Sequence, residues 1–224
     1  MSRTVLVTGA SRGLGTEIVR QLAAAGCTVV AGTRDPADGD RVATELGVRS
    51  VPLDVTDPTS VTAAVDWIRE HLGRLDALVN NAAVNFDSGA DPLTEDLDVV
   101  DEAWRTNVLA VWRLIRTAAP LLREGIEPVV VNVTSELGSL ARMRAHSPAY
   151  SVSKAALNAT TRVFADALAP VVVQSVSPGW TATDMGGRGG RPVADGAAGI
   201  VSAVLRPTVH PSGSFLADGR TVPW

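Results

Sequence analysis

Short runs of β-branched residues alternate with longer stretches of helical period along the 224-residue chain. Several runs, such as Val129–Val133, are apolar on both faces, which is typical of parallel strands covered by helices on both sides. The alternation predicts an α/β fold, a doubly wound sheet of seven parallel strands with helices on both faces, in a single domain over residues 1–224. The expected strands are 4–8, 28–33, 49–53, 77–80, 128–134, 171–177 and 214–217. The expected helices are 13–25, 39–46, 58–71, 96–122, 148–168 and 193–205.

The composition limits the classes of partner. Hydrophobic residues make up 46% of the chain and charged residues 20%, which excludes a disordered protein. The 20 basic residues face 24 acidic ones, so no global positive field attracts nucleic acid or an anionic membrane. No apolar run approaches the length of a membrane span, and the stretch before Gly9 is too short for a signal peptide. The single cysteine, Cys27, is expected to be a small buried hydrophobe. We therefore expect a cytoplasmic enzyme or binding protein with a small-molecule ligand.

A glycine-rich turn with the pattern TGxxxGxG separates the first expected strand from the first expected helix. In such a turn Gly9 allows a tight bend, Gly13 lets the backbone approach a pyrophosphate, and Gly15 lets the helix pack closely on the strand. An ordinary glycine-rich turn is the alternative, but the strand before it and the helix after it favour a dinucleotide site. The cofactor contacts expected in this turn are Gly9, Ser11, Arg12, Gly13, Leu14 and Gly15.

The end of the second expected strand favours NADP over NAD. Proteins that bind NAD usually place a carboxylate there, on the ribose hydroxyls, whereas this chain has Thr33. Arg34 and Arg12, from neighbouring loops, are able to pair with a 2′-phosphate. Two alternatives stay open: Arg34 is a solvated loop charge, or the strand ends one residue later and brings Asp35 to the ribose.

Polar residues also follow the third and fourth expected strands. Asp54 is placed to accept a hydrogen bond from an adenine amino group, with Val55 against the ring, although capping the next helix explains Asp54 nearly as well. Asn80 and Asn81, followed by Ala82, end the fourth strand. Their amides either tie neighbouring strand ends together or hold the ribose of adenosine.

The chain's only tyrosine, Tyr150, and its only lysine, Lys154, lie four residues apart at the start of an expected helix. This spacing places both side chains on one face of the helix. A free phenol has a pKa of about 10, too high for proton transfer at neutral pH, so the chemistry requires an adjacent ammonium that stabilises the phenolate. Tyr150 and Lys154 are therefore a candidate acid–base pair.

Two polar residues from other elements are expected to join this pair. Ser135 follows the fifth expected strand, where its hydroxyl would hold a carbonyl oxygen beside the phenol. Asn107 lies inside an expected helix, where an amide is unfavourable unless it has a specific partner. A water molecule held by Asn107 would connect Lys154 to solvent.

These motifs, in this order, resemble those of the short-chain dehydrogenases/reductases, and the resemblance runs from Thr4 to the C-terminus. It implies a Rossmann fold with Tyr150 as the general acid/base and Ser135 as the residue that orients the substrate. It also implies that Lys154 binds the nicotinamide ribose and lowers the pKa of the tyrosine, and that Asn107 completes a proton relay. Further cofactor contacts that match the family pattern are Asp54, Val55, Asn81, Ala82, Lys154, Pro178, Gly179 and Thr183. The segment 180–185 and the last ten residues look most like those of NADPH-dependent carbonyl reductases.

The sequence departs from the family pattern at two places. Ala83 stands where the family usually has glycine, and the interval from Ser135 to Tyr150 is slightly longer than usual, but neither change removes a catalytic group. The expected substrate contacts are Ser135, Glu136, Tyr150 and Trp180, and the expected pocket walls are Val84, Glu136, Leu137, Met143, Trp180 and Met185. Core packing is an equal alternative for Trp180 and Met185. The glycine run 186–190 predicts a mobile lid, with a flexible linker as the alternative.

The expected function is the NADPH-dependent reduction of a ketone or aldehyde to the alcohol, a reversible reaction in which Tyr150 supplies the proton. One alternative is a ketoreductase that acts on carrier-bound or secondary-metabolite substrates, which Arg142 and Arg144 leave open. An alternative of another class is a regulator that senses NADP without chemistry. The three histidines have no ligand spacing, so no metal is expected. The stretch 96–122 is apolar on more than one face, which predicts a homo-oligomer, a dimer or tetramer.

Overall fold

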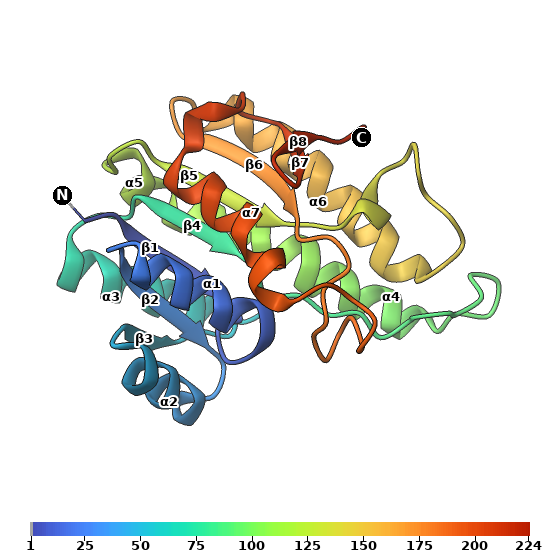
Figure 1. Ribbon diagram of the computed structural model, residues 1–224, viewed down its shortest axis with the longest axis horizontal. Coiled ribbons are helices and arrows are strands. Elements are labelled where there is room, and N and C mark those ends of the chain that lie inside the picture. The colour runs from blue at the N-terminus through green and yellow to red at the C-terminus, as the bar shows by residue number, and fades with distance from the viewer. Residues whose placement is uncertain (1) are drawn as a thin grey trace.

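A single eight-stranded sheet forms the centre of the protein in the computed structural model, which describes residues 2–224 (Figure 1). The strand order is β3-β2-β1-β4-β5-β6-β7-β8, and all neighbours up to β7 pair in parallel. The predicted doubly wound parallel sheet is therefore confirmed. The strands are β1 (Thr4–Thr8), β2 (Thr28–Thr33), β3 (Arg49–Pro52), β4 (Ala77–Asn80), β5 (Val129–Val133), β6 (Val172–Ser177), β7 (Phe215–Ala217) and β8 (Arg220–Thr221).

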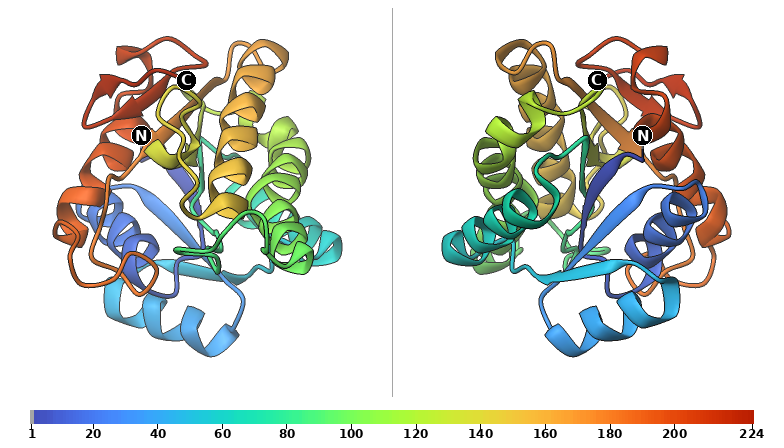
Figure 2. Two further views of the ribbon diagram at one scale, coloured as in Figure 1. Left: turned by 90° about the vertical axis from the view of Figure 1, so that its right-hand side faces the viewer. Right: turned by 90° about the vertical axis from the view of Figure 1, so that its left-hand side faces the viewer.

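Helices cover both faces of this sheet, as the two end-on views in Figure 2 show. One apolar cluster joins the sheet to α1, α2 and α7, and the other joins it to α3, α5 and α6. The helices are α1 (Gly13–Ala24), α2 (Pro36–Leu46), α3 (Pro58–Leu72), α4 (Leu97–Trp104), α5 (Ala110–Arg123), α6 (Pro148–Ala167) and α7 (Val193–Leu205). Shorter turns are a π-helix, η1 (Arg105–Leu109), and two 3-10 turns, η2 (Glu136–Gly138) and η3 (Pro207–Val209). No helix among the described residues is long and apolar enough to cross a membrane.

The prediction of seven strands was wrong by one. β8 turns back on β7 and pairs with it in antiparallel fashion. Asp218 and Gly219 form the connection, with φ values of 49° and 69°. Two consecutive residues with positive φ are what a two-residue hairpin turn requires, and Asp-Gly is a typical sequence for it.

Two predicted helix boundaries also change. The helix expected over 39–46 begins at Pro36, because Asp35 caps it by accepting a hydrogen bond from the Ala37 N–H, and proline is favoured in the first turn. The helix expected over 96–122 is interrupted by the π-helical turn η1. Such wide turns often occur at functional sites, and this one carries Asn107.

A chain of buried polar side chains fixes α6 against the middle of the sheet. Asn80 on β4 donates to Asn132 on β5 at 2.8 Å, and Asn132 donates to Thr161 on α6 at 2.9 Å. Thr161 in turn lies 2.7 Å from the Ser175 hydroxyl on β6. Because buried polar groups are costly unless they are paired, these bonds give α6 a defined position over β5 and β6.

Candidate functional site

A cavity of about 1790 Å³ opens where the C-terminal ends of the parallel strands meet the loops that follow them. Every residue predicted to contact cofactor or substrate lines it, from the glycine turn through Arg34 and Asp54 to Tyr150, Lys154, Trp180 and Thr183. The fourth predicted catalytic residue, Asn107, is completely buried and does not line the cavity. The structure therefore brings together side chains that the sequence separates by up to 174 positions, as Gly9 and Thr183 show.

The glycine turn has the backbone that its sequence predicts. Gly9 and Gly13 have φ values of 61° and 56°, and a Cβ atom on Gly15 would lie 2.1 Å from the Gly9 carbonyl oxygen. No side chain among the described residues caps the start of α1, so its first N–H groups are free to bind an anion at the positive end of the helix. Asn81 donates to the carbonyls of Thr8 and Gly9, at 2.9 and 3.1 Å. The sequence left two interpretations of Asn81 open, tying strand ends together or holding the ribose. Its hydrogen bonds show the first.

The charges beside β2 differ partly from the prediction. Asp35 caps α2, so its carboxylate is engaged there, while Arg34 is exposed and lines the cavity. Arg12, predicted to act with Arg34, instead forms a 2.7 Å ion pair with Asp184, and both side chains are exposed. The sequence reasoning missed Arg41, which lines the cavity and donates to the Ser11 carbonyl at 2.6 Å. Asp35-Pro36 is a recognisable helix start. Had it been used, Arg41 would have been predicted in the second turn of α2, near the glycine turn that contains Ser11.

Asp54 lies in a turn of its own rather than at the start of α3. Its carboxylate accepts hydrogen bonds from the N–H and the hydroxyl of Thr56, at 2.9 and 2.7 Å. The hydroxyl of Thr56 is the main cause that lowers the pKa of Asp54, and the charge of Arg34 lowers it further. Asp57 is the residue that caps α3. The capping interpretation of Asp54 was therefore wrong, and its carboxylate lies at the cavity wall.

Tyr150 lies in the first turn of α6 and is only 9% exposed. Burial, with a smaller contribution from the negative charge of Asp87, raises its pKa to about 12. A side-chain hydrogen bond with Ser135 acts in the opposite direction. Ser135 also accepts from the Leu137 N–H at 3.2 Å, which fixes its hydroxyl beside the phenol.

Lys154 lies one turn further along α6, with its Nζ 5.5 Å from the centre of the Tyr150 ring. Its ammonium donates to the Val133 carbonyl at 2.9 Å. Burial lowers the pKa of Lys154 to about 7. The two side chains lie together, as the four-residue spacing predicted, but the pKa of Tyr150 is raised rather than lowered, because burial is the largest influence on it.

Asn107 uses its amide to hold the loop after β4. Its Oδ1 accepts from the Val84 N–H at 2.9 Å, and its Nδ2 donates to the Val84 carbonyl at 3.0 Å. The same Nδ2 donates to Ser153 on α6 at 2.9 Å, and Ser153 donates to the Tyr150 carbonyl at 2.7 Å. This buried amide thus has specific partners, as predicted. They are protein groups, the backbone of Val84 in the loop after β4 and the hydroxyl of Ser153 on α6.

The substrate end of the cavity is lined by Val84, Glu136, Leu137, Trp180 and Met185, as predicted, whereas the predicted wall residue Met143 does not line it. Trp180 is 67% exposed and Met185 is 45% exposed, so the core-packing alternative for both was wrong.

The segment expected to be a mobile lid is folded against itself. The Trp180 indole donates to the Gly186 carbonyl at 2.7 Å, and a Cβ atom on Gly189 would lie 2.5 Å from the Trp180 ring. Thr181 and Arg191 form a β-bridge at the base of the segment. A glycine is thus needed at position 189 to admit the indole ring, which explains part of the glycine run without a flexible linker.

The sequence reasoning missed two residues of the site, Thr134 and Asp87. Thr134 lines the cavity, whereas Asp87 does not. Thr134 lines the cavity directly before Ser135, and its buried hydroxyl has no hydrogen-bond partner among the described residues. Asp87 is 3% exposed and binds the start of α6. Neither residue belongs to a motif that could have identified it.

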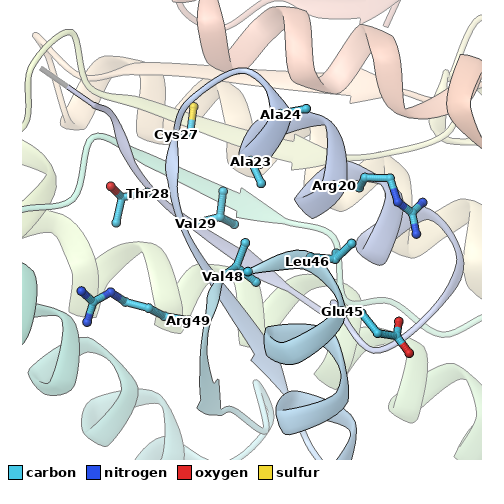
Figure 3. A pocket seen from close by; sticks show the side chains of 11 residues that line it. Arg20, Ala23, Ala24, Cys27, Thr28, Val29, Glu45, Leu46, Val48 and Arg49 are labelled. Carbon is cyan, nitrogen blue, oxygen red and sulfur yellow. The ribbon is translucent and has the colours of Figure 1, made fainter.

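A smaller hollow of about 540 Å³ lies at the opposite, N-terminal edge of β2 and β3 (Figure 3). Cys27 lines it and is half-buried, so it is less buried than the expected small buried hydrophobe. Burial raises the pKa of its thiol. Nowhere in residues 2–224 do three potential metal ligands cluster.

Comparisons with known proteins agree with this site. The family model described as short chain dehydrogenase matches residues 3–191. The chain is 30% identical to "Short-chain dehydrogenase/reductase 1" of Saponaria officinalis, over 99% of its own length and 96% of that protein. It is also 30% identical to "(+)-neomenthol dehydrogenase" of Arabidopsis thaliana, over 96% of both chains. Among solved structures, the NADPH-bound carbonyl reductase from chicken fatty liver superposes with a TM-score of 0.91 at 29% identity, covering 100% of this chain and 99% of the other.

Proposed function

The chain belongs to the short-chain dehydrogenase family, and we propose that it reduces a ketone or aldehyde to the alcohol with NADPH, with Tyr150 as the proton donor. The observation that carries the proposal is the convergence of Ser135, Tyr150 and Lys154 in one cavity with the glycine turn. The name of the chicken carbonyl reductase structure supports both the cofactor and the carbonyl substrate.

The residues present fit a dinucleotide. The uncapped start of α1 offers N–H groups to a pyrophosphate, and the turn before it packs so closely on Ala82 and Asn81 that neither Gly9 nor Gly15 leaves room for a side chain. The unpartnered hydroxyl of Thr134 is a buried group that a bound ligand would satisfy. The contacts we assign to the cofactor are Gly9, Ser11, Arg12, Gly13, Leu14, Gly15, Arg34, Asp54, Val55, Asn81, Ala82, Lys154, Pro178, Gly179 and Thr183.

The charges at the β2 end favour the 2′-phosphate of NADP over the free ribose of NAD. Thr33 occupies the place at the end of β2 where a carboxylate would bind the ribose, and the neighbouring Asp35, which also lines the cavity, uses Oδ1 to cap α2. Arg34 is exposed at the cavity, and none of the ion pairs among the described residues involves it. A free guanidinium beside a cavity pairs readily with a phosphate.

In the proposed reaction the cofactor, when bound, supplies the hydride that reduces the carbonyl carbon. Ser135 donates a hydrogen bond to the carbonyl oxygen and holds it beside the phenol. Tyr150 is protonated at neutral pH, because its pKa is about 12, and it gives its proton to that oxygen as negative charge develops. Lys154, with an ammonium pKa of about 7, lies close enough to stabilise the resulting phenolate.

A second candidate is a ketoreductase for carrier-bound substrates, which would need a free cation near the substrate end. Arg142 is engaged with Glu136 at 2.6 Å, which leaves Arg144, exposed in the same loop, without an ion pair among the described residues. We favour free ketones and aldehydes, because Arg142, one of the two arginines of this loop, is already paired. A regulator that senses NADP without chemistry would have no need of the Tyr150–Ser135 hydrogen bond.

The reaction is tested by transfer of label. We expect the protein to consume NADPH with a panel of aryl ketones, aldehydes and ketoacyl thioesters, and NADPH deuterated at C4 of its nicotinamide to place deuterium on the carbinol carbon, read by mass spectrometry. Higher kcat/KM for thioesters of pantetheine than for free ketones would favour the second candidate. The absence of any carbonyl-dependent NADPH consumption would contradict both.

The cofactor preference is tested by binding alone. Arg34→Ala should weaken NADPH binding, read from the fluorescence of the bound nucleotide, by about 10-fold or more, because one charge-assisted phosphate contact is lost. The same change should leave NADH binding unaltered. Arg49→Ala, at the opposite edge of the sheet, is the matched control. Equal losses for NADPH and NADH would contradict the assignment of Arg34 to the phosphate.

We also propose that the protein is a homo-oligomer built on α4, α5 and α6. Trp104 and Trp112, on α4 and α5, are 40% and 42% exposed, and Val152 and Val163 on α6 are each 51% exposed. The exposed faces of α5 and α6 adjoin, because the Trp112 ring packs edge-on against the Phe164 ring of α6, with 4.9 Å between the ring centres. Large apolar side chains gathered on neighbouring helices are typical of a surface covered by another subunit.

A further inference from the structure

Asp87, in the loop after β4, carries a buried carboxylate that no motif explains. Its side chain is only 3% exposed, and none of the ion pairs among residues 2–224 includes it. A buried carboxylate without a cation is costly unless N–H groups satisfy it. Its Oδ2 accepts from the Ala149 N–H at 2.6 Å, and both its oxygens lie 3.3 Å from the Tyr150 N–H. Asp87 thus binds Ala149 and Tyr150 at the start of α6, which follow it in the sequence by 62 and 63 positions.

The start of α6 needs such an external partner. Ser147 occupies the capping position but has a φ of 50° and makes no side-chain cap. Pro148, the first helical residue, has no N–H. Ser151 already donates to the Ser147 carbonyl at 2.8 Å. The remaining free donors of the first turn are Ala149 and Tyr150, and these are the two that Asp87 binds.

Asp87 also completes a ring around the cavity. Asn107 grips Val84 through both backbone groups and donates to Ser153, and Ser153 donates to the Tyr150 carbonyl. The Tyr150 N–H then bonds to Asp87, which lies three positions after Val84 in the chain. Tyr150 is therefore held at its carbonyl by one side of the ring and at its N–H by the other. Loss of Asp87 would leave the N–H side open.

Few charged groups approach the phenol. Lys154 faces it from α6, Asp87 from the loop after β4, and the Ser135 hydroxyl from the end of β5. Glu136 and His146 line the same cavity, but Glu136 is paired with Arg142 and His146 is exposed. From the segment after β6, Asp184 is exposed and paired with Arg12. Asp87 is thus the buried negative charge that opposes formation of a phenolate.

We propose that Asp87 is a positioning residue for Tyr150: its carboxylate fixes the first turn of α6 against the loop after β4, and its buried negative charge opposes formation of a phenolate. A protonated phenol is the form that donates a proton to a carbonyl. Asp87 therefore holds Tyr150 in place and favours the protonated form with which carbonyl reduction begins. Only this consequence for the reaction rests on the proposed function; the structural and electrostatic roles do not.

The charge is tested without activity, because Tyr150 is the only tyrosine in the chain and its phenolate absorbs near 295 nm. Asp87→Asn keeps a carbonyl oxygen for the two N–H groups and removes the charge. At every alkaline pH at which circular dichroism shows both proteins folded, D87N should contain more tyrosinate than the wild type, with the titration displaced by roughly one pH unit to lower pH. Tyr150→Phe supplies the baseline, and Asp57→Asn, which changes the cap of α3, should titrate like the wild type. Equal tyrosinate in D87N and the wild type would overturn the electrostatic role.

The positioning role is tested by amide hydrogen exchange. Asp87→Ala should speed exchange in a peptide spanning 147–152 at least about 10-fold, since its N–H groups lose their acceptor, whereas D87N should stay close to the wild type. In reduction assays D87A should lower kcat more than it changes KM, and D87N should restore most of kcat. Unchanged exchange in D87A would overturn the positioning role. Inactivity of the wild-type protein would count against the proposed function and leave the exchange and absorbance results standing.

Discussion

At the scale of single residues, depth of burial decides the charge of Tyr150 and Lys154. Both lie where a charged group is poorly solvated, so the pKa of the phenol is raised to about 12 and the pKa of the ammonium is lowered to about 7. The four-residue spacing predicted that the two side chains meet, but it carries no information on how far from water they meet. For this reason the sequence predicted that Tyr150 and Lys154 lie together, and predicted the direction of the tyrosine's pKa shift wrongly.

The shift of Lys154 predicts a dependence of stability on pH. Its pKa falls from the ordinary 10.5 to about 7, so between these values the unfolded chain binds more protons than the folded one. The contribution of Lys154 therefore destabilises the fold fully below about pH 7 and fades as the pH rises toward 10.5. Lys154→Met should raise Tm at pH 6 and change it little at pH 10, because it removes a buried ammonium.

Thermal unfolding followed by circular dichroism at the two pH values checks this prediction. Arg123→Met, which removes an exposed cation from α5, is the control and should alter Tm equally at both. A lower Tm for K154M at pH 6 would show that the hydrogen bond from Lys154 to Val133 outweighs the cost of burying the charge. Loss of catalysis is expected in K154M regardless of its stability.

At the scale of elements, the turn between β1 and α1 is tightly packed. A methyl group on Gly15 would lie 2.1 Å from the Gly9 carbonyl oxygen and 2.7 Å from the Asn81 amide nitrogen. Both contacts are with groups that hydrogen bonds already hold in place. A side chain at position 15 would therefore displace either α1 or the hydrogen bond from Asn81 to the Gly9 carbonyl.

Gly15→Ala tests this packing. We expect a loss of about 1–3 kcal/mol in the free energy of unfolding, the usual cost of overpacking, and a loss of NADPH binding. Gly199→Ala in α7 is the matched control, because its new methyl group would approach nothing closer than 4.0 Å and alanine favours a helix. Urea unfolding and nucleotide fluorescence measure both effects. A G15A protein as stable as G199A, with undiminished binding, would contradict the packing argument.

The elements that sequence reasoning predicted well are those whose signals are local. The glycine turn, the Tyr150–Lys154 spacing and the strands of the parallel sheet depend on neighbours along the chain, and the structure contains all three. Asp87 was missed because its partners lie 62 and 63 positions away. The ion pair of Arg12 with Asp184 spans 172 positions and was missed for the same reason. The Asp218-Gly219 hairpin, by contrast, was visible in the sequence and was overlooked.

At the scale of the whole molecule, the two edges of the sheet differ in function. The C-terminal edge holds the large cavity, and the smaller hollow beside Cys27 lies at the opposite edge. The apolar faces of α4, α5 and α6 are turned away from the sheet, so a second subunit placed there would leave the cavity of each subunit with its own set of residues. The position of the Tyr150 side chain would still depend on the contact between subunits, because α6 carries both Tyr150 and the exposed Val152 and Val163.

Light scattering with size-exclusion chromatography tests the proposed oligomer. The wild-type mass should be at least twice the subunit mass of 23.3 kDa. Val163→Arg should lower it toward one subunit, because a charge cannot be buried unpaired in an apolar interface. Val209→Arg, which changes a residue that is 63% exposed on η3, should keep the wild-type mass. A wild-type mass of one subunit would contradict the proposal.

The central claim is that a protonated phenol, held between Ser135 and Lys154, gives the proton in carbonyl reduction. The most direct test compares wild type and Tyr150→Phe for NADPH binding and for kcat/KM with the best ketone of the panel. The account predicts equal NADPH affinity and a loss of about 100-fold or more in kcat/KM, since only the phenolic proton is removed. An equal kcat/KM in the two proteins would contradict it.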